Sequence, residues 1–271
     1  MTDPRAAIFA WARDLKGSGL SQAEVDRGNA LLDALGAEKM AAGEAKGGFW
    51  SNPAAGRAGS STGITDDSYL PLFQRMASLQ ANPETVKAMA RSFAAHAHGF
   101  GQDASKARIA EFVAQIANET GGFRVFEEDL RYRADTLVRQ WPTHFTRAQA
   151  VAAVGNPIEI ASRAYGGRMG NAPYPSQDGY TYRGRGALQL TGRAAYRRYG
   201  ELTGLPLEDQ PSLAADPSDS VLIALAFFKD RNVNAAIDRG DFREARRLTN
   251  GGAIGLEEVA RLRAKALEAL K

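Results

Sequence analysis

Two glutamates, Glu119 and Glu128, are the residues of this sequence whose type and setting best suit catalysis. The segment before Glu119 places apolar residues at the three- and four-residue steps of one helical face, namely Ile109, Phe112, Val113 and Ile116. Glu119 occupies the next position of that face, where the pattern calls for another apolar side chain. It also precedes Gly121 and Gly122, which predict the helix end, where a negative charge opposes the helix dipole. A residue that breaks two local rules is a candidate functional residue.

The chemistry that such a pair of carboxyl groups could perform is the hydrolysis of a glycosidic bond. A partly desolvated carboxyl group near the negative end of a helix keeps its proton more readily, as a general acid must. Glu128 lies between Glu127 and Asp129, which predicts a wetter, acidic setting for it. Glycoside hydrolysis requires one acid and one base or nucleophile in such different surroundings. The sequence does not give the separation of the two carboxyl groups, so inverting and retaining chemistry both stay open. A solvated glutamate at a fraying helix end is the alternative for Glu119.

Composition limits the classes of protein and cofactor to consider. The chain has 271 residues, 44% of them hydrophobic, which is ordinary for a globular protein with a sizeable core. It contains no cysteine, so disulfide scaffolds and thiolate zinc sites are excluded, and its three histidines lack metal-ligand spacing. We therefore expect no metal and no cofactor. No apolar run is long enough for a membrane span, and the N-terminal segment lacks the features of a signal peptide, so we expect synthesis in the cytoplasm.

The charge pattern bears on the class of partner. The net charge is +3, and arginines gather late in the chain, at Arg183, Arg185, Arg193, Arg197 and Arg198 and again at Arg239, Arg243, Arg246 and Arg247. Their commoner interpretation is a set of solvated helix faces, because acidic residues are interleaved with them. A basic surface would also favour an anionic polymer, either nucleic acid or cell-wall glycan. We expect no nucleic acid partner, because base-stacking aromatics on a strand pattern are missing.

Composition also divides the chain near Thr65. Residues 1–38 read as two short helices, too few to bury a core alone, and residues 39–66 are rich in Gly, Ala, Ser and Pro, as a flexible connector is. We therefore predict an N-terminal helical extension with a linker over 1–65 and a second domain over 66–271. The extension is either a cell-wall-binding or delivery appendage or a helical addition that packs on the second domain.

The second domain reads as mainly helical. Apolar periodicity and punctuation by Gly or Pro predict helices over 69–79 and 83–99, a helix that ends at Glu119, and further helices over 134–141, 146–154, 192–200, 218–228, 233–239, 241–248 and 255–271, with another from 158. The exception is 166–191, for which we predict a loop with a small hairpin and no phosphate-binding motif. In this loop Gly184 and Gly186 permit a close approach of the backbone to a ligand. Residues 249–252 read as a turn.

Five ordered motifs make the second domain resemble a known family. They read AQIANETGGF, EEDLRY, RAYGGRMGN, YRGRGALQLTGRAAYRRYG and LTNGGAIGLEEVARLR. Together they resemble glycoside hydrolase family 19, the group of plant-type chitinases and bacteriophage endolysins, and the resemblance extends over residues 66–271. It implies a mainly α, lysozyme-like, two-lobed helical domain with a small β-hairpin and a substrate cleft between the lobes.

The resemblance also implies roles for individual residues. Glu119, in NETGG, would be the general acid and Glu128 the general base of an inverting reaction. Thr191, in LQLTG, would hold the attacking water through its hydroxyl group. Substrate-binding roles would fall to Gln189, Asn250, Tyr182, Arg185 and Tyr196.

Departures from the family pattern point to its endolysin branch. Ala195 stands where many relatives have asparagine, Ala253 and Ile254 stand where the chitinases have an acidic residue, and the cysteines of the plant enzymes are absent. We therefore predict an endolysin-type peptidoglycan hydrolase, a lysozyme that cleaves the bond between N-acetylmuramic acid and N-acetylglucosamine. A chitinase is the alternative, and a catalytically inactive glycan-binding phage protein is the third possibility.

The predicted endolysin would act as a monomer on the glycan chains of the cell wall. Because the sequence suggests neither a signal peptide nor a membrane anchor, its release from the cytoplasm would depend on a membrane-permeabilising partner such as a holin.

Overall fold

The computed structural model describes residues 66–271, and the predicted extension over 1–65 lies outside the described residues. The described part carries the helices α3 to α14 and three short 3-10 helices, with no extended strand among them. The prediction of a mainly helical domain is confirmed. None of the described helices is long and apolar enough to span a membrane.

Helix α5 (Lys106–Glu119) is the centre of the largest hydrophobic core. Ser105 caps its first turn by accepting a hydrogen bond from the Arg108 backbone N–H at 3.2 Å. The predicted apolar face is buried, with Phe112 and Ile116 fully inaccessible. The burial goes further than the prediction, however, because Glu111 and Gln115 on another face are fully buried too. Because neighbouring elements pack against α5 on nearly every side, the position of its last residue, Glu119, is fixed.

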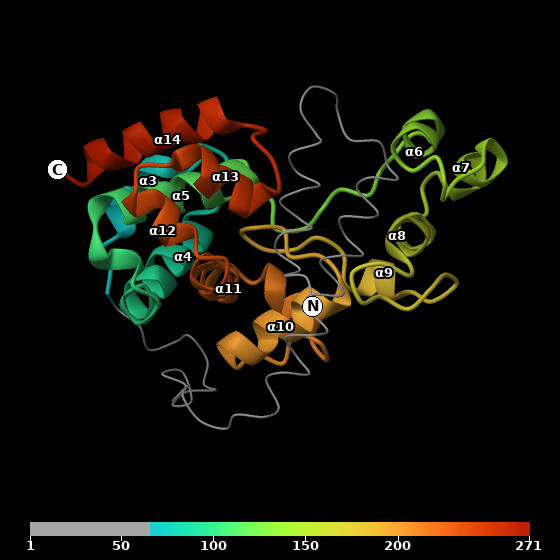
Figure 1. Ribbon diagram of the computed structural model, residues 1–271, viewed down its shortest axis with the longest axis horizontal. Helices are drawn as coiled ribbons and strands as arrows, with labels where there is room; N and C mark the ends of the chain where they lie inside the picture. The colour runs from blue at the N-terminus through green and yellow to red at the C-terminus, as the bar shows by residue number, and fades with distance from the viewer. Residues whose placement is uncertain (1–65) are drawn as a thin grey trace, which may run out of the picture. The chain divides into compact units, whose positions relative to one another are not determined.

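The neighbours of α5 come from both ends of the domain (Figure 1). They are α3 (Leu70–Met76), α4 (Pro83–His96), α11 (Pro217–Asp230), α12 (Val233–Asp238), α13 (Phe242–Asn250) and α14 (Leu256–Ala269). Aromatic rings fill the interior, where Phe112 lies 5.4 Å from Phe93 and 5.0 Å from Phe228 between ring centroids. Contacts between residues that are far apart in the sequence thus fix the surroundings of Glu119.

A second hydrophobic core lies among the helices that follow the acidic segment (Figure 1). These helices are α6 (Ala134–Gln140), α7 (Arg147–Ala153), α8 (Pro157–Tyr165) and the short α9 (Asp178–Thr181). Trp141 is the C-cap of α6, immediately before Pro142, as the sequence predicts. Its ring packs edge-on against Tyr132 and Tyr165, so this core reaches the segment that carries Glu128.

A third core joins α10 (Arg193–Thr203) to the loop before it. The predicted hairpin in this loop is reduced to isolated antiparallel bridges, one between Arg185 and Leu190 and one between Arg185 and Glu127. The reason is a tight turn, in which Gly186 has φ +80° and Gln189 has φ +54°. The turn leaves room for a single pair of backbone hydrogen bonds and not for two strands.

The predicted turn over 249–252 is partly wrong. Helix α13 continues through Asn250, and Gly251 ends it in the left-handed conformation with φ +77°. Asn250 therefore lies one helical turn after Arg246, so both residues lie on the same face of α13.

Candidate active site

Glu119 is the last residue of α5, and polar groups of α13 surround its carboxylate. Its Oε1 accepts a hydrogen bond from Arg246 Nη1 at 2.6 Å and one from Asn250 Nδ2 at 3.1 Å. A longer contact, 3.5 Å, comes from Asn118 Nδ2. The side chain is 19% exposed. The expectation of an apolar setting is therefore wrong, because a guanidinium group from a distant helix occupies the space that the periodicity assigned to the core.

The guanidinium group of Arg246 is buried, with 2% of the side chain exposed. Besides Glu119 it binds Gln115 Oε1, through Nη1 at 2.7 Å, and the backbone oxygen of Ile254, through Nε at 2.8 Å. Its planar fork fixes all three acceptors relative to one another. Arg246 thus connects α5, α13 and the segment before α14.

The polar contacts continue along α5 away from Glu119. Gln115 Nε2 donates to Glu111 Oε1 at 2.8 Å, and Arg263 Nη1 donates to Glu111 Oε2 at 3.0 Å. Burial raises the pKa of Glu111, although the hydrogen bonds from Arg263 and Gln115 oppose the rise. These hydrogen bonds along α5 were not predicted from the sequence. The pattern that could have revealed them is the four-residue spacing of Glu111, Gln115 and Glu119, which places three polar residues on one side of an otherwise apolar helix.

Glu128 is held by the loop after α9 and by a tyrosine of α8. Its Oε1 accepts a hydrogen bond from the Gly184 backbone N–H at 3.0 Å, and its own N–H donates to the Gly184 oxygen at 3.0 Å. Its Oε2 accepts a hydrogen bond from the Tyr165 hydroxyl at 2.8 Å. Burial, together with the negative charge of Glu128, raises the pKa of Tyr165, so the phenol keeps its proton and remains a donor. The sequence motif containing Tyr165 was recognised, but not the role of this residue.

The acidic setting predicted for Glu128 is modified by arginines, because each of the two acids beside it is paired with arginine. Glu127 accepts hydrogen bonds from Arg183 at 2.6 Å and Arg185 at 3.2 Å. Burial acts to raise the pKa of Glu127, but these two arginines outweigh it and lower the pKa. Hydrogen bonds from Arg131 lower the pKa of Asp129 to about 2. Among residues 66–271, the hydrogen-bond donors to the Glu128 carboxylate are neutral groups, unlike those to Glu127 and Asp129.

Three predicted site residues come together around Gly184. A β-carbon built on Gly184 would lie 3.1 Å from Gln189 Oε1, 3.3 Å from Thr191 Oγ1 and 3.5 Å from Glu128 Cβ. The Thr191 hydroxyl donates to the Gln189 backbone oxygen at 2.9 Å. Glu128, Gln189 and Thr191 therefore form one group, and Glu119 with Asn250 forms another. Among residues 66–271 no hydrogen bond or ion pair joins the two groups.

Tyr182, Arg185 and Tyr196 lie beneath this loop, with 6%, 5% and 0% of each residue exposed. Arg185 Nη1 donates to the Tyr196 hydroxyl at 3.0 Å, and that hydroxyl donates to the Arg183 backbone oxygen at 2.7 Å. The Tyr182 hydroxyl donates to the Glu208 backbone oxygen at 3.1 Å. In the structure these three buried side chains support the backbone of the loop, and their contacts with sugar stay a prediction.

No group of three or more side chains suited to hold a metal ion occurs within the described range, 66–271. The chemistry that the site residues offer is that of carboxyl, amide and hydroxyl groups.

The hydrogen bonds of Arg246 predict that replacing it destabilises the protein much more than replacing its neighbour Arg247. Replacing the buried Arg246 by Met removes the charged donor of Glu119 and the donor that binds Gln115 Oε1, and should lower the free energy of unfolding by about 3 kcal/mol. Arg247, 59% exposed and paired with Glu244 on the same helix, is the matched control, and Arg247→Met should cost less than about 1 kcal/mol. Urea unfolding of both variants measures the two losses. Equal losses would show that Arg246 has no structural role of this kind.

Comparison with known proteins supplies the family. No protein-family model matches the sequence. A glycosyl hydrolase family 19 domain-containing protein of Haemophilus influenzae is 30% identical over 184 residues, which cover 66% of this chain and 88% of that protein. An endochitinase of Arabidopsis thaliana is 26% identical over 168 residues, covering 62% of this chain and 47% of the plant protein.

Solved structures of chitinase C are also similar to the chain. The structure from Streptomyces griseus covers 83% of this chain and 79% of its own, with 17% identity and a TM-score of 0.46. The Haemophilus relative is matched over 88% of its length. The chain belongs to glycoside hydrolase family 19 and is a glycoside hydrolase.

Proposed function

We propose that the enzyme cleaves a β-1,4 bond beside N-acetylglucosamine with inversion, with Glu119 as general acid and Glu128 as general base. The observation that carries this proposal is the difference between the hydrogen bonds of the two carboxyl groups. Among residues 66–271 the hydrogen-bond donors to Glu119 all bind Oε1, so Oε2 remains for a proton and for the glycosidic oxygen. Glu128 accepts a hydrogen bond from one neutral donor on each oxygen, which leaves lone pairs on both oxygens for the proton of a water.

Thr191 and Gln189 would complete the site on the side of Glu128. The Thr191 hydroxyl lies beside Gly184, next to the Glu128 side chain, where it could hold the attacking water. Inversion needs that water between the two carboxyl groups, which in such enzymes are about 6.5–9.5 Å apart. Gln189 Oε1 faces the same space at Gly184 and would accept a hydrogen bond from the sugar.

We propose peptidoglycan as the polymer, cut between N-acetylmuramic acid and N-acetylglucosamine after release from the cytoplasm. Support comes from Ala253 and Ile254 in place of the acidic residue of the chitinases, from the lack of cysteine, and from a net charge of +3, which suits an anionic cell wall. Chitin is the second candidate, because a relative is named an endochitinase and both polymers contain N-acetylglucosamine.

The acid and base roles predict the behaviour of three carboxyl variants. Glu119→Gln and Glu128→Gln should each lower kcat by about 100- to 10,000-fold, because each removes one partner of a general acid–base pair. Asp129→Asn, which changes an exposed acid one residue from Glu128, should retain activity within about twofold. The release of new reducing ends from purified peptidoglycan and from chitin oligomers gives kcat for each variant. Activity of either glutamine variant at the level of Asp129→Asn would exclude the mechanism.

The same digests identify the polymer and the stereochemistry. A muramidase leaves N-acetylmuramic acid at the new reducing end of peptidoglycan, and borohydride reduction followed by mass spectrometry identifies it. Rapid cleavage of chitin oligomers without cleavage of peptidoglycan would select the second candidate. Binding of either polymer with no new reducing ends would point to an inactive glycan-binding protein. Proton NMR of the first products distinguishes the α-anomer expected for inversion from the β-anomer.

The hydrogen bond from the Tyr165 hydroxyl to Glu128 predicts that kcat falls when this hydroxyl is removed. Tyr165→Phe removes one neutral donor from Glu128, and a hydrogen bond to a charged group contributes about 1.5–3 kcal/mol, so kcat should fall about tenfold to hundredfold. Because the raised pKa of Tyr165 keeps its proton in place, the loss should appear across the whole neutral pH range.

Tyr174→Phe is the control for this variant, because Tyr174 is 42% exposed and its hydroxyl binds Glu159 on the surface. Equal values of kcat for Tyr165→Phe and Tyr174→Phe would mean that the hydrogen bond from Tyr165 to Glu128 does not contribute to catalysis.

The close contacts that a β-carbon at Gly184 would make predict that a single methyl group there lowers activity. In Gly184→Ala the new β-carbon would displace the side chains of Gln189 and Thr191 by a few tenths of an ångström. Small misplacements of this kind cost up to about 100-fold in rate, so kcat should fall by at least about tenfold while circular dichroism stays unchanged. Gly99→Ala, where nothing lies within 4 Å of the new carbon, should keep full activity. Equal activity of the two variants would remove Gly184 from the site.

A further inference from the structure

Two polar residues of α5, Glu111 and Gln115, are fully buried, and the proposed reaction gives neither of them a role. They lie two turns and one turn before Glu119 on the same side of the helix. A buried charged residue is weak evidence for stability, because an apolar side chain of similar size in its place is often neutral or stabilising. Polar residues that interrupt an apolar core are therefore candidates for a functional role.

The amide group of Gln115 is fixed by a charged partner on each side. Its Nε2 donates to Glu111 Oε1 at 2.8 Å, and its Oε1 accepts a hydrogen bond from Arg246 Nη1 at 2.7 Å. The reversed amide would place N–H groups against the guanidinium and an oxygen against the carboxylate, so one orientation alone satisfies both partners. Glu111 is held in turn by Arg263, whose Nη1 donates to Glu111 Oε2 at 3.0 Å. The Gln115 oxygen therefore has a fixed position next to Arg246.

The guanidinium group of Arg246 is consequently held from two directions. Nε donates to the Ile254 backbone oxygen at 2.8 Å, and Nη1 donates to Gln115 Oε1. Among residues 66–271 its contact with Glu119 is a single hydrogen bond, from Nη1 to Oε1 at 2.6 Å. Arginine and carboxylate groups frequently pair through two parallel hydrogen bonds, which occupy both carboxylate oxygens. The observed pair instead leaves Glu119 Oε2 outside the contact.

We propose that Glu111 and Gln115 are positioning residues that prevent Arg246 from binding both oxygens of Glu119. Without the Gln115 oxygen, Nη1 loses one of its two acceptors, and the guanidinium is free to turn about its contact with Ile254. Nη1 and Nη2 can then pair with both carboxylate oxygens, and Oε2 is closed to a proton. The consequence for catalysis rests on the proposed function, in which Glu119 Oε2 delivers the proton to the glycosidic oxygen.

Gln115→Met tests the proposal, because methionine has a similar volume and offers Arg246 only a weak acceptor. On the polymer that the wild-type enzyme cleaves, kcat should fall at least about tenfold, because the acid loses its productive arrangement. KM should change by less than about twofold, because the buried Gln115 cannot contact substrate. A crystal structure of the variant should show two hydrogen bonds between Arg246 and Glu119. Unchanged kcat, or a single hydrogen bond in that structure, would overturn the proposal.

A second substitution in the same protein separates positioning from a merely structural role. Lysine at position 246 keeps the positive charge but has a single ammonium group and no planar fork, so it cannot bind both oxygens as arginine does. Adding Arg246→Lys to Gln115→Met should therefore raise kcat at least about threefold above that of Gln115→Met alone. If Gln115 only supports the core, the second substitution should lower kcat further, and that result would overturn the proposal.

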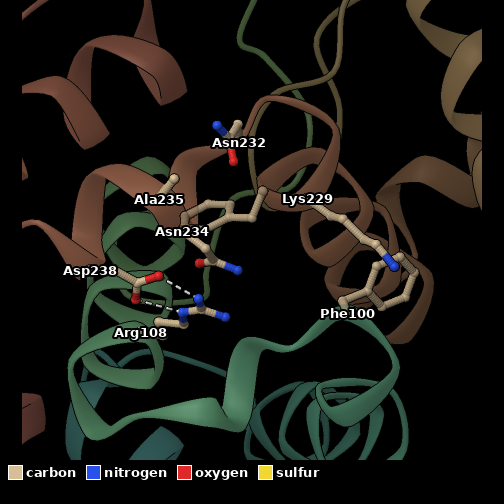
Figure 2. A pocket seen from close by; sticks show the side chains of 8 residues that line it. Phe100, Arg108, Lys229, Asn232, Asn234, Ala235 and Asp238 are labelled. Carbon is tan, nitrogen blue, oxygen red and sulfur yellow. Dashed lines mark hydrogen bonds and ion pairs between the residues drawn. The ribbon is translucent and has the colours of Figure 1, made fainter.

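Glu111→Leu tests the other member of the pair independently, so the proposal does not depend on the folding of one variant. It removes the acceptor of Gln115 Nε2 and should lower kcat about threefold to tenfold. Arg108→Leu is the matched control, because it breaks an ion pair between the first turn of α5 and Asp238 of α12 (Figure 2). It should keep kcat within about twofold of the wild type. Equal losses in the two variants would indicate general damage to α5 and overturn the role of Glu111.

Failure of this proposal is distinguishable from failure of the proposed function. Loss of activity in Glu119→Gln together with full activity in Gln115→Met would refute the positioning role and leave Glu119 as the acid. Full activity in Glu119→Gln would refute the acid role. The crystal structure of Gln115→Met would still show whether Gln115 controls how Arg246 binds Glu119.

Discussion

The buried guanidinium group of Arg246 is the constraint on which the geometry around Glu119 depends. A charge so fully removed from water must have several acceptors, and here they come from α5 and from the backbone before α14. Each acceptor limits where the others can lie, so α5, α13 and the Ile254 segment hold one arrangement. Glu119 ends a helix that is buried on nearly every side, and Arg246 sets the direction of its carboxylate.

Glu128 is positioned by different means, because no regular element carries it. Two hydrogen bonds with the backbone of Gly184 fix the Glu128 N–H and the Glu128 Oε1. The Tyr165 hydroxyl fixes the other carboxylate oxygen, Oε2. The loop containing Gly184 rests in turn on the buried side chains of Arg185 and Tyr196. The glycine matters because a side chain at that place would occupy the space shared by Glu128, Gln189 and Thr191. A loop can hold a carboxylate in one orientation in this way, because hydrogen bonds fix both its main chain and its side chain.

Periodicity predicted much of the fold and only part of the site. The apolar face that ends at Glu119, the helix stop before Pro142 and the mainly helical class could be predicted because each depends on residues close in sequence. The setting of Glu119 could not, since Arg246 lies 127 positions later and periodicity describes one helix at a time. The hairpin was overpredicted because the pattern of Gly and aromatics does not reveal the left-handed turn at Gly186 and Gln189. The burial of Tyr182 could not be predicted either, because an aromatic residue in a glycine-rich segment is as typical of a ligand-binding loop as of a loop that packs against the core.

The two glutamates differ in a way that only the structure reveals, and the difference bears on which of them can be the acid. A general acid needs one oxygen that accepts no hydrogen bond from the protein, so that a proton can lie toward the leaving group. In the part of the chain that the structure describes, the donors to Glu119 all bind Oε1. A general base benefits from donors that stabilise its negative charge without bringing a positive one, since a nearby cation would weaken its attraction for the proton of water. Glu128 meets this condition because Arg183 and Arg185 are engaged with Glu127, and Arg131 with Asp129. The arginines beside Glu128 thus neutralise its neighbours and leave Glu128 itself to a backbone N–H and a phenol.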